Sequence, residues 1–163
     1  MRLVSLLFIV DGDKVLLGKK KERPGKTFGA GYWNGFGGGV EEGETIEESA
    51  CRETLEECGL TVKPEDLKKV AHINFEFAEK PDYNHDAHVF VTQKFSGEPT
   101  ETEEMAPAWH DINNLPLSEM WPADVHWVPL VLSQNKTIEA HCVFIGSEKP
   151  FPVGSFEYTE TKF

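Results

Sequence analysis

The segment GGVEEGETIEESACRETLEECGL, residues 38–60, is the most informative part of this chain. It places Glu53, Glu56 and Glu57 at positions i, i+3 and i+4 of one expected helix, so the three carboxylates point the same way. Like charges on one helix face repel one another, and helix propensity gives no reason for them. A hard divalent cation such as Mg²⁺ takes oxygen ligands and would remove this repulsion.

The residues that flank this segment predict where the helix begins and ends. Thr45 is followed three residues later by Glu48, a spacing typical of a capping box, so we expect the helix to begin at Ile46. Gly59 is suited to end it, because glycine adopts the conformation of a helix C-terminus without strain. The sequence therefore predicts a helix over residues 46–58.

Spacing also predicts what the helix contacts. Ile46, Ala50 and Leu55 offer an interrupted apolar side toward a core. Arg52 and Glu56 lie four residues apart, so they can pair and hold that carboxylate in one orientation.

A loop rich in glycine, with Gly37, Gly38, Gly39 and Gly43, surrounds the start of this segment. Its backbone can come close to a ligand because glycine has no side chain. A loop of this kind that leads into an acidic helix is a candidate site for a cation and a phosphate. A solvated acidic helix face explains the three glutamates alone equally well, and both interpretations stay open at this point.

The composition of the 163 residues favours one domain, over residues 1–163, with an adequate core. The net charge of −12 argues against unaided binding to nucleic-acid polymers or anionic membranes, although metal ions can neutralise the contact with a polyphosphate. Residues 1–15 do not have the pattern of a signal peptide, and no apolar run is long enough to span a bilayer. The three cysteines indicate free thiols in a reducing cytoplasm, since Cys51 and Cys58 lie roughly 10 Å apart along one helix.

Alternation and turn residues predict a mixed sheet covered by two helices. The expected strands and extended segments span residues 2–10, 14–17, 32–37, 67–77, 87–95, 108–112, 137–145 and 155–161. The second helix is expected over residues 121–134, with Pro122 near its first turn.

Three further features leave alternatives open. The basic cluster Lys19–Lys26 could bind phosphates or be a solvated loop, and Lys20 is its best single candidate for a phosphate contact. His85 and His88 could bind a transition metal, but no cysteine or third histidine is close in sequence, so ordinary structural histidines are preferred. Aromatic residues could form core or stack a nucleobase, and the sequence does not sort them.

The whole segment resembles the Nudix hydrolase box almost position for position. The matching residues are Gly38, Glu44, Arg52, Glu53, Glu56, Glu57 and Gly59. One position departs: the aliphatic site after Arg52-Glu53 is Thr54, with Leu55 beside it, which we interpret as a packing change on the buried side of the helix.

Most of residues 2–145 also resembles the oxidised purine nucleoside triphosphatases, the MutT-homologue group that sanitises nucleotide pools and so limits DNA damage. The likeness rests on four motifs, at residues 28–38, 74–77, 103–105 and 120–127. It implies a Nudix-type αβα sandwich of the α/β (α+β) class. It also implies hydrolysis of a purine nucleoside triphosphate such as 8-oxo-dGTP to the monophosphate and pyrophosphate, with Mg²⁺ as cofactor or Mn²⁺ as its substitute. We expect the protein to be a monomer.

The resemblance also implies the site residues. The metal ligands would be the Gly37 carbonyl, Glu53, Glu56, Glu57 and Glu104. The catalytic residues would be Glu53, Glu57 and Arg52, with either Glu57 or Glu53 as general base. The substrate-binding residues would be Ser5, Lys20, Phe28, Asn34, Gly38, Phe75, Trp121, Asp124 and Trp127.

Two positions depart from the family pattern. Ala123 stands where the family has the first of two adjacent aspartates, so the chain has fewer ways to match different oxidised bases. Gly39 stands where a lysine is common, which removes a possible phosphate or surface contact. The rival hypotheses are hydrolysis of a dinucleoside polyphosphate or nucleotide sugar, and a nucleotide-binding module without catalysis.

Overall fold

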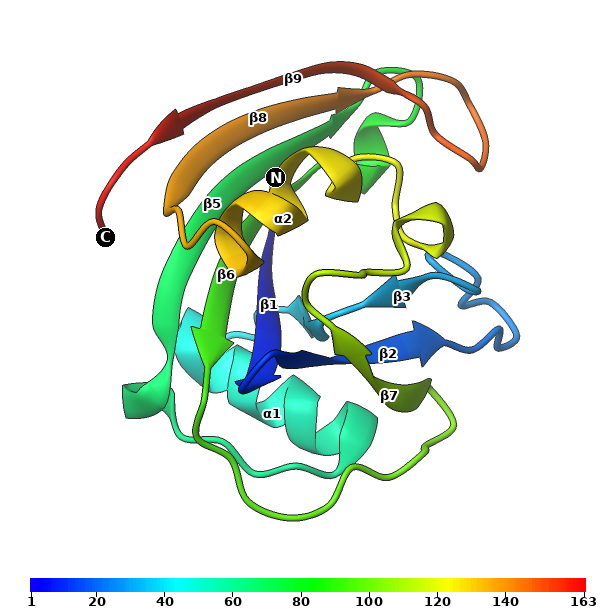
Figure 1. Cartoon of the computed structure of the whole chain (residues 1–163). Helices are drawn as coiled ribbons and strands as arrows, with labels where there is room; N and C mark the ends of the chain where they lie inside the picture. Colours follow the sequence, from blue (N-terminus) through cyan, green and yellow to red (C-terminus); the bar gives the residue numbers. More distant parts are fainter.

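A mixed β-sheet of nine strands separates the two α-helices of the computed structural model, which describes all residues from 1 to 163 (Figure 1). The strands are β1 Arg2–Asp11, β2 Lys14–Lys20, β3 Trp33–Asn34, β4 Phe36–Gly39, β5 Lys68–Phe77, β6 His85–Thr92, β7 Met105–Asp111, β8 Ile138–Phe144 and β9 Val153–Glu160. The helices are α1 Ile46–Cys58 and α2 Asp124–Leu132, with short 3₁₀ turns at Pro64–Asp66, Pro81–Tyr83 and Leu117–Glu119.

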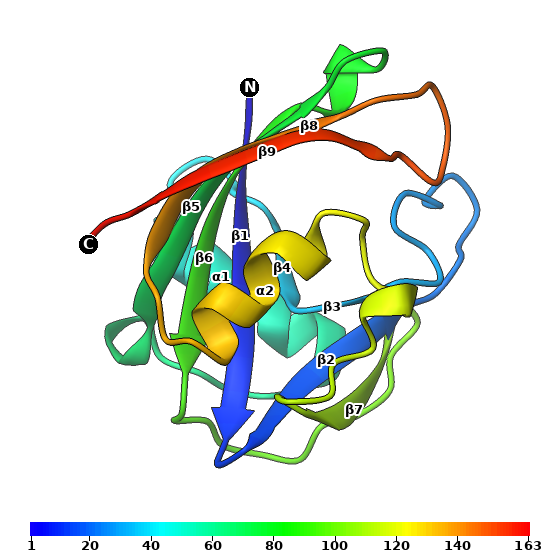
Figure 2. The same ribbon diagram turned by 45° about the horizontal axis from the view of Figure 1, so that its top comes forward.

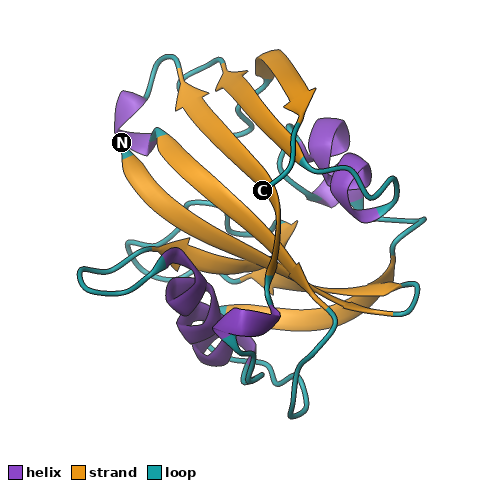
Figure 3. Ribbon diagram, turned by 90° about the vertical axis from the view of Figure 1, so that its left-hand side faces the viewer, coloured by secondary structure: helices purple, strands orange, loops and turns teal.

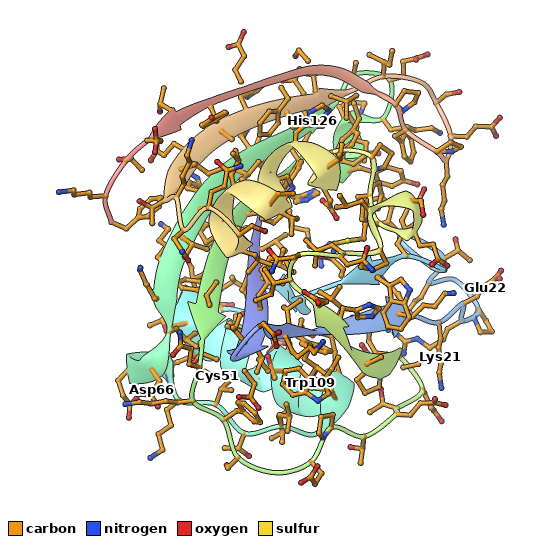
Figure 4. The ribbon with its side chains drawn as sticks, in the orientation of Figure 1. Lys21, Glu22, Cys51, Asp66, Trp109 and His126 are labelled. Atoms are coloured by element: carbon orange, nitrogen blue, oxygen red, sulfur yellow. The ribbon has the colours of Figure 1, made fainter.

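The strands follow the order β3-β2-β1-β6-β5-β8-β9, with β4 paired to β1 and β7 paired to β2. The β1–β6 and β5–β8 pairs are parallel, and the other pairs are antiparallel. Figure 2 shows how β8 and β9 arch across the molecule above α2. In this arrangement His126 of α2, labelled in Figure 4, stacks on Phe156 of β9 with ring centroids 5.4 Å apart.

Figure 3 shows one α-helix on each face of the sheet. An apolar core lies under each of them. Leu7 and Ile9 of β1 belong to the core that contains Ala50 of α1. Phe8 and Val10, which alternate with them, belong to the larger core that contains residues of α2. This period of two is the sandwich pattern of a strand buried on both faces, and it confirms the expected αβα architecture.

The predicted boundaries of α1 are confirmed. The Thr45 hydroxyl accepts a hydrogen bond from the Glu48 amide, and the Glu48 carboxylate accepts one from the Thr45 amide, which together form the capping box. Gly59 ends the helix in the left-handed conformation, with φ of 77°. These contacts satisfy backbone groups that a helix end otherwise leaves without partners.

The predicted apolar side of α1 is partly wrong. Leu55 is 54% exposed, whereas Thr54 is fully buried beside Ala50. A rotation of about 100° per residue takes Leu55 off the buried face that Ala50, Thr54 and Cys58 share. The Thr54 hydroxyl donates a hydrogen bond to the Ala50 carbonyl at 2.7 Å, so it is satisfied within the helix and tolerates an apolar surrounding.

The second helix is shorter than predicted. It begins at Asp124, not at Trp121, and ends at Leu132. Pro122 lies in the turn before the helix, where the Asp124 amide bonds to the Trp121 carbonyl. Strand β7 begins three residues before the predicted start, because it pairs with β2 as far as the Lys20–Met105 match. A bilayer-spanning helix needs a long apolar run, and none of the helices has one.

Candidate functional site

Three carboxylates converge where α1 meets the glycine-rich strand β4. One oxygen atom from each of Glu53, Glu57 and Glu104 lies within 4.8 Å of the others. Glu53 and Glu57 come from α1, and Glu104 precedes β7. Glu57 is only 6% exposed, so the solvated acidic face considered for this helix does not describe it. Carboxylate oxygens at these separations suit a hard divalent cation.

The backbone of β4 holds two of these side chains. The Glu57 Oε1 atom accepts a hydrogen bond from the Gly37 amide at 2.9 Å. A Cβ atom on Gly38 would lie 2.7 Å from Glu53 Oε1, and one on Gly37 would lie 1.8 Å from the Ser5 carbonyl oxygen. The glycines are therefore required by close packing against α1 and β1, and not by unusual backbone angles.

Arg52 ties the loop, the glycine strand and the helix together. Its guanidinium bonds to both oxygens of Glu44, at 2.8 and 3.0 Å, and to the Gly39 carbonyl at 3.2 Å. It also donates to Glu53 Oε1 at 3.0 Å, so it fixes the orientation of one carboxylate of the cluster. The hydrogen bonds from Arg52 lower the pKa of Glu44 to about 2, which keeps this clamp charged at neutral pH.

Glu104 is positioned by Thr102, a residue that the sequence did not single out. The Thr102 hydroxyl donates to the Glu57 carbonyl at 2.9 Å and accepts from the amides of Glu104 and Met105, each at 3.2 Å. The end of α1 and the segment that carries Glu104 are thereby fixed to one another. A side-chain hydroxyl of this kind has no recognisable sequence spacing, because the partner that it joins to this segment, the Glu57 carbonyl, lies 45 residues away.

Glu56 lies apart from the cluster. Its side chain is 51% exposed, and its Oε2 atom lies 3.3 Å from Arg52 Nη1. The predicted pair of Arg52 and Glu56 is therefore present. The role of Glu56 as a metal ligand stays a prediction, since its carboxylate is not among the three that converge.

Burial makes the cluster difficult to ionise without a counterion. It raises the pKa of Glu57 to about 8, against the effect of the Gly37 amide and with a further rise from Glu53 and Glu104. Burial also raises the pKa of Glu53, although Arg52 opposes this rise. A divalent cation supplies the positive charge that these carboxylates lack, so the donor set fits such an ion.

A cavity of about 220 Å³ extends from this cluster to α2. Gly37 and Glu57 line one part, and Trp121, Asp124 and Trp127 line another. All nine predicted substrate residues line this one cavity: Ser5, Lys20, Phe28, Asn34, Gly38, Phe75, Trp121, Asp124 and Trp127. The structure therefore brings together residues from distant parts of the sequence, and their binding roles stay predictions.

Asp124 is the polar group at the α2 side of the cavity. It is 4% exposed, and its Oδ1 atom accepts a hydrogen bond from Trp127 Nε1 at 3.1 Å. Its Oδ2 atom is buried and has no hydrogen-bond partner. Burial raises the pKa of Asp124 to about 7, so near neutral pH the carboxyl group can be protonated and can both donate and accept.

Two further polar side chains line the cavity. Asn34 Oδ1 accepts a hydrogen bond from the Gly35 amide at 2.8 Å, which leaves the Nδ2 group free to donate. Lys20 is partly buried near Glu57 and Glu104, and burial lowers its pKa while the Glu57 charge opposes that change. An ammonium group in this position can contact an anion that reaches the carboxylate cluster.

The structure shows which of the aromatic residues line the cavity and which do not. Phe28 is 37% exposed at the cavity and packs against Trp121 with ring centroids 5.0 Å apart. Trp127 and Phe77 are fully buried in the larger core and also form cavity wall. Trp109 is 38% exposed on β7, is absent from the cavity wall and is labelled in Figure 4. Sequence reasoning missed Tyr32 and Phe144 as wall residues, since nothing in the sequence distinguishes them from ordinary core.

Comparison with known proteins gives consistent matches. The chain matches the NUDIX domain family over residues 1–131. It is 48% identical to an oxidized purine nucleoside triphosphate hydrolase of Mus musculus over 135 residues, which are 83% of this chain and 82% of that protein. It is 47% identical to the protein of the same name from Danio rerio, with the same coverage. A MutT mutator protein of Bacillus halodurans, 25% identical, superposes with a TM-score of 0.80 over 97% of both chains.

The chain therefore belongs to the Nudix family. In this chain the Nudix box forms the glycine strand β4 and the acidic helix α1, which the Glu44–Arg52 pair joins. The family match ends within α2, whereas the Bacillus halodurans structure also covers nearly all of the remaining chain.

Proposed function

We propose that this protein hydrolyses oxidised purine nucleoside triphosphates, such as 8-oxo-dGTP, to the nucleoside monophosphate and pyrophosphate, and so removes damaged precursors from the nucleotide pool. The main support is one cavity that joins the Glu57 carboxylate at the glycine strand to Asp124 and the aromatic residues near α2. A triphosphate and a base attached to it need those two environments at once. The names of the Mus musculus and Danio rerio relatives agree with this activity.

The cation of the proposed reaction is Mg²⁺, for which Mn²⁺ can substitute. Glu53, Glu57 and Glu104, with the Gly37 carbonyl, would hold it, and Glu56 could join them after a change of side-chain rotamer. When bound, the ion neutralises phosphate oxygens and stabilises the developing charge on the leaving group.

Side chains of the protein have the other roles in the proposed reaction. Glu57 or Glu53 takes a proton from the attacking water, and both remain candidates for this role. Arg52 acts through Glu53, whose carboxylate it orients at 3.0 Å. Lys20 neutralises part of the phosphate charge from the wall of the cavity.

The base would lie beside Phe28 and Trp121, in reach of Asp124 Oδ2 and the Asn34 amide. A protonated Asp124 donates one hydrogen bond and accepts others, which suits the mixed donor and acceptor edge of an oxidised purine. Ala123, where the family pattern has an aspartate, is fully buried in the apolar core, so this chain offers one carboxyl group to the base. We therefore expect this protein to accept fewer kinds of oxidised base than a site with two carboxyl groups would.

We also propose that the protein acts as a monomeric single domain in the cytoplasm, with no nucleic-acid polymer or membrane as partner. The free cysteines Cys51, Cys58 and Cys142 suit a reducing compartment. The net charge of −12 disfavours anionic polymers and lipid surfaces.

The test is a substrate panel with pyrophosphate and monophosphate both measured. We expect kcat/KM for 8-oxo-dGTP to exceed that for dGTP and dATP, with 2-oxo-dATP compared under the same Mg²⁺ concentration. Faster cleavage of a dinucleoside polyphosphate or a nucleotide sugar would show that this compound, and not the oxidised triphosphate, is the preferred substrate. Tight binding of the triphosphate in calorimetry without product would exclude catalysis.

A further inference from the structure

A second group of metal-ligating side chains lies outside the cavity described above. His72 of β5 faces its register partner His88 of β6, and Asp86 lies two residues before His88 on the same face of the sheet. His88 also matches Ser5 across the β1–β6 pair, and Ser5 contacts Ser49 of α1, so this is the α1 face of the sheet. None of these three side chains lines the cavity.

The ligand atoms of the three side chains are already close. One atom from each of His72, Asp86 and His88 lies within 4.8 Å of the others. His72 Nε2 lies 2.8 Å from Asp86 Oδ1, and His88 Nε2 lies 3.6 Å from Asp86 Oδ2. Two ligands of a tetrahedral zinc ion with bonds of about 2.0–2.1 Å are about 3.4 Å apart, which is close to the separations in this group. The His72 and His88 rings stack with centroids 4.4 Å apart, so one ring must turn out of the stack for both to reach a single ion.

The surroundings favour an ion over a simple histidine–aspartate pair. His88 Nδ1 is buried without a hydrogen-bond partner, so no second contact fixes the His88 ring in its present orientation. His72 Nδ1 lies 3.6 Å from Glu139 Oε1 on β8, which is how a carboxylate orients a metal-bound imidazole from its other nitrogen. The side chains of His72 and Asp86 are 31% and 28% exposed, which leaves an entry path and room for water as a further ligand.

We propose that His72, Asp86 and His88 form a second cation site, for a divalent transition metal of the Zn²⁺ type, with Glu139 holding His72 in place. Two imidazoles and one carboxylate suit Zn²⁺, Co²⁺ or Ni²⁺, whereas the all-carboxylate cluster suits Mg²⁺. The bound ion would join β5 to β6, and through Glu139 to β8, on the side of the sheet away from the α2 core. Its role would be to stabilise the sheet, and it would take no part in hydrolysis.

The experiment is titration of the tag-free, metal-free full chain with ZnCl₂ in the absence of nucleotide, followed by calorimetry. Glu57→Gln serves as the background, because it removes a carboxylate of the first cluster that could also take Zn²⁺. In that background we expect one site, with affinity reduced at least 10-fold by His88→Gln and by His72→Gln, and about 10-fold by Glu139→Gln. His141→Gln, an exposed histidine on β8, is the matched control and should leave the site unchanged.

Co²⁺ absorption gives a second readout that does not depend on activity. The background protein should show visible bands of a four- or five-coordinate ion, and Asp86→Asn should weaken them even if one histidine variant folds poorly. Bound Zn²⁺ should raise the melting temperature of the background protein and leave that of His88→Gln unchanged. If the His88→Gln and Asp86→Asn proteins bind Zn²⁺ and Co²⁺ as the background does, the three side chains are an ordinary hydrogen-bonded group and the proposal is wrong.

Discussion

Glu57 Oε1 accepts a hydrogen bond from the Gly37 amide at 2.9 Å, which joins the last turn of the acidic helix to the glycine strand. Glu57 is 6% exposed, and this contact fixes the orientation of its carboxylate at the wall of the cavity. It also explains why the glycine strand and the helix must occur together in the sequence, since each positions part of the other.

Replacement of Glu57 or Glu53 by glutamine should remove catalysis without unfolding the protein. Each variant loses a charge that the proposed cation needs, so we expect kcat for 8-oxo-dGTP to fall by about 100-fold or more. Circular dichroism and thermal unfolding should show an intact fold, because the amide keeps the shape of the side chain.

The matched control is Glu47→Gln, which neutralises a glutamate in the first turn of the same helix, outside the carboxylate cluster. It should retain the activity of the parent. If Glu53→Gln and Glu57→Gln both hydrolyse the substrate as fast as this control, the assignment of the cluster is incorrect.

Two adjacent glycines should respond differently to alanine. At Gly37 the new Cβ would lie 1.8 Å from a backbone oxygen of Ser5, so β4 must move and we expect a loss of stability of several kcal/mol. At Gly38 the new Cβ would meet the Glu53 carboxylate at 2.7 Å, which can swing away. Gly38→Ala should therefore stay folded but lose activity. Urea unfolding and kcat, measured on both variants, check this difference, and equal effects on stability would contradict it.

Asp124→Asn should change how stability depends on pH. In the folded protein the pKa of Asp124 is about 7, whereas an unfolded aspartate ionises near 3.9, a reference value. Between these values the unfolded chain has released the proton that the folded chain keeps. The free energy of unfolding of the parent therefore falls as pH rises through this window and is level above it.

Asparagine does not titrate, so the free energy of unfolding of the variant should rise relative to that of the parent as the pH increases. We expect a change of roughly 2–3 kcal/mol between pH 5 and pH 8, measured by urea unfolding at both values. A difference that stays constant over this range would show that Asp124 is ionised throughout.

Phe28→Ala should weaken substrate binding more than it slows the chemical step. Loss of a stacking surface worth ~1–3 kcal/mol per base should raise KM by about 10-fold or more, with a smaller effect on kcat. Trp109→Ala is the control, since Trp109 is as exposed as Phe28, 38% against 37%, but lies on β7 away from the cavity wall (Figure 4). An unchanged KM in Phe28→Ala would remove Phe28 from the base site.

Much of α1 could be predicted because its signals are local. The capping box, the terminal glycine and the Arg52–Glu56 pair depend on residues three to four positions apart, and all three are present. Leu55 was misplaced because the buried side of the helix includes Thr54, whose hydroxyl is satisfied by the helix backbone. Residue type alone gave no sign of that bond.

The rest of the site depends on contacts between distant segments. Glu104 entered only through the family resemblance, since Thr102, which positions it, joins the Glu104 amide to a backbone carbonyl of α1, and that contact has no sequence pattern. The sequence paired His88 with His85 and could not group it with His72, because only the register of β5 with β6 brings His72 and His88 together. The cavity wall likewise contains aromatic residues of the core and aromatic residues that could contact a substrate, and the two groups consist of the same residue types.

The most direct test of the central proposal is a crystal structure with Mn²⁺ and a non-hydrolysable analogue of 8-oxo-dGTP, read by the anomalous signal of the metal. We predict manganese between Glu53, Glu57 and Glu104, in contact with the triphosphate, and the oxidised base beside Asp124 and Phe28. Manganese absent from the three carboxylates, with the nucleotide bound outside the cavity, would contradict the proposed site and the reaction assigned to it.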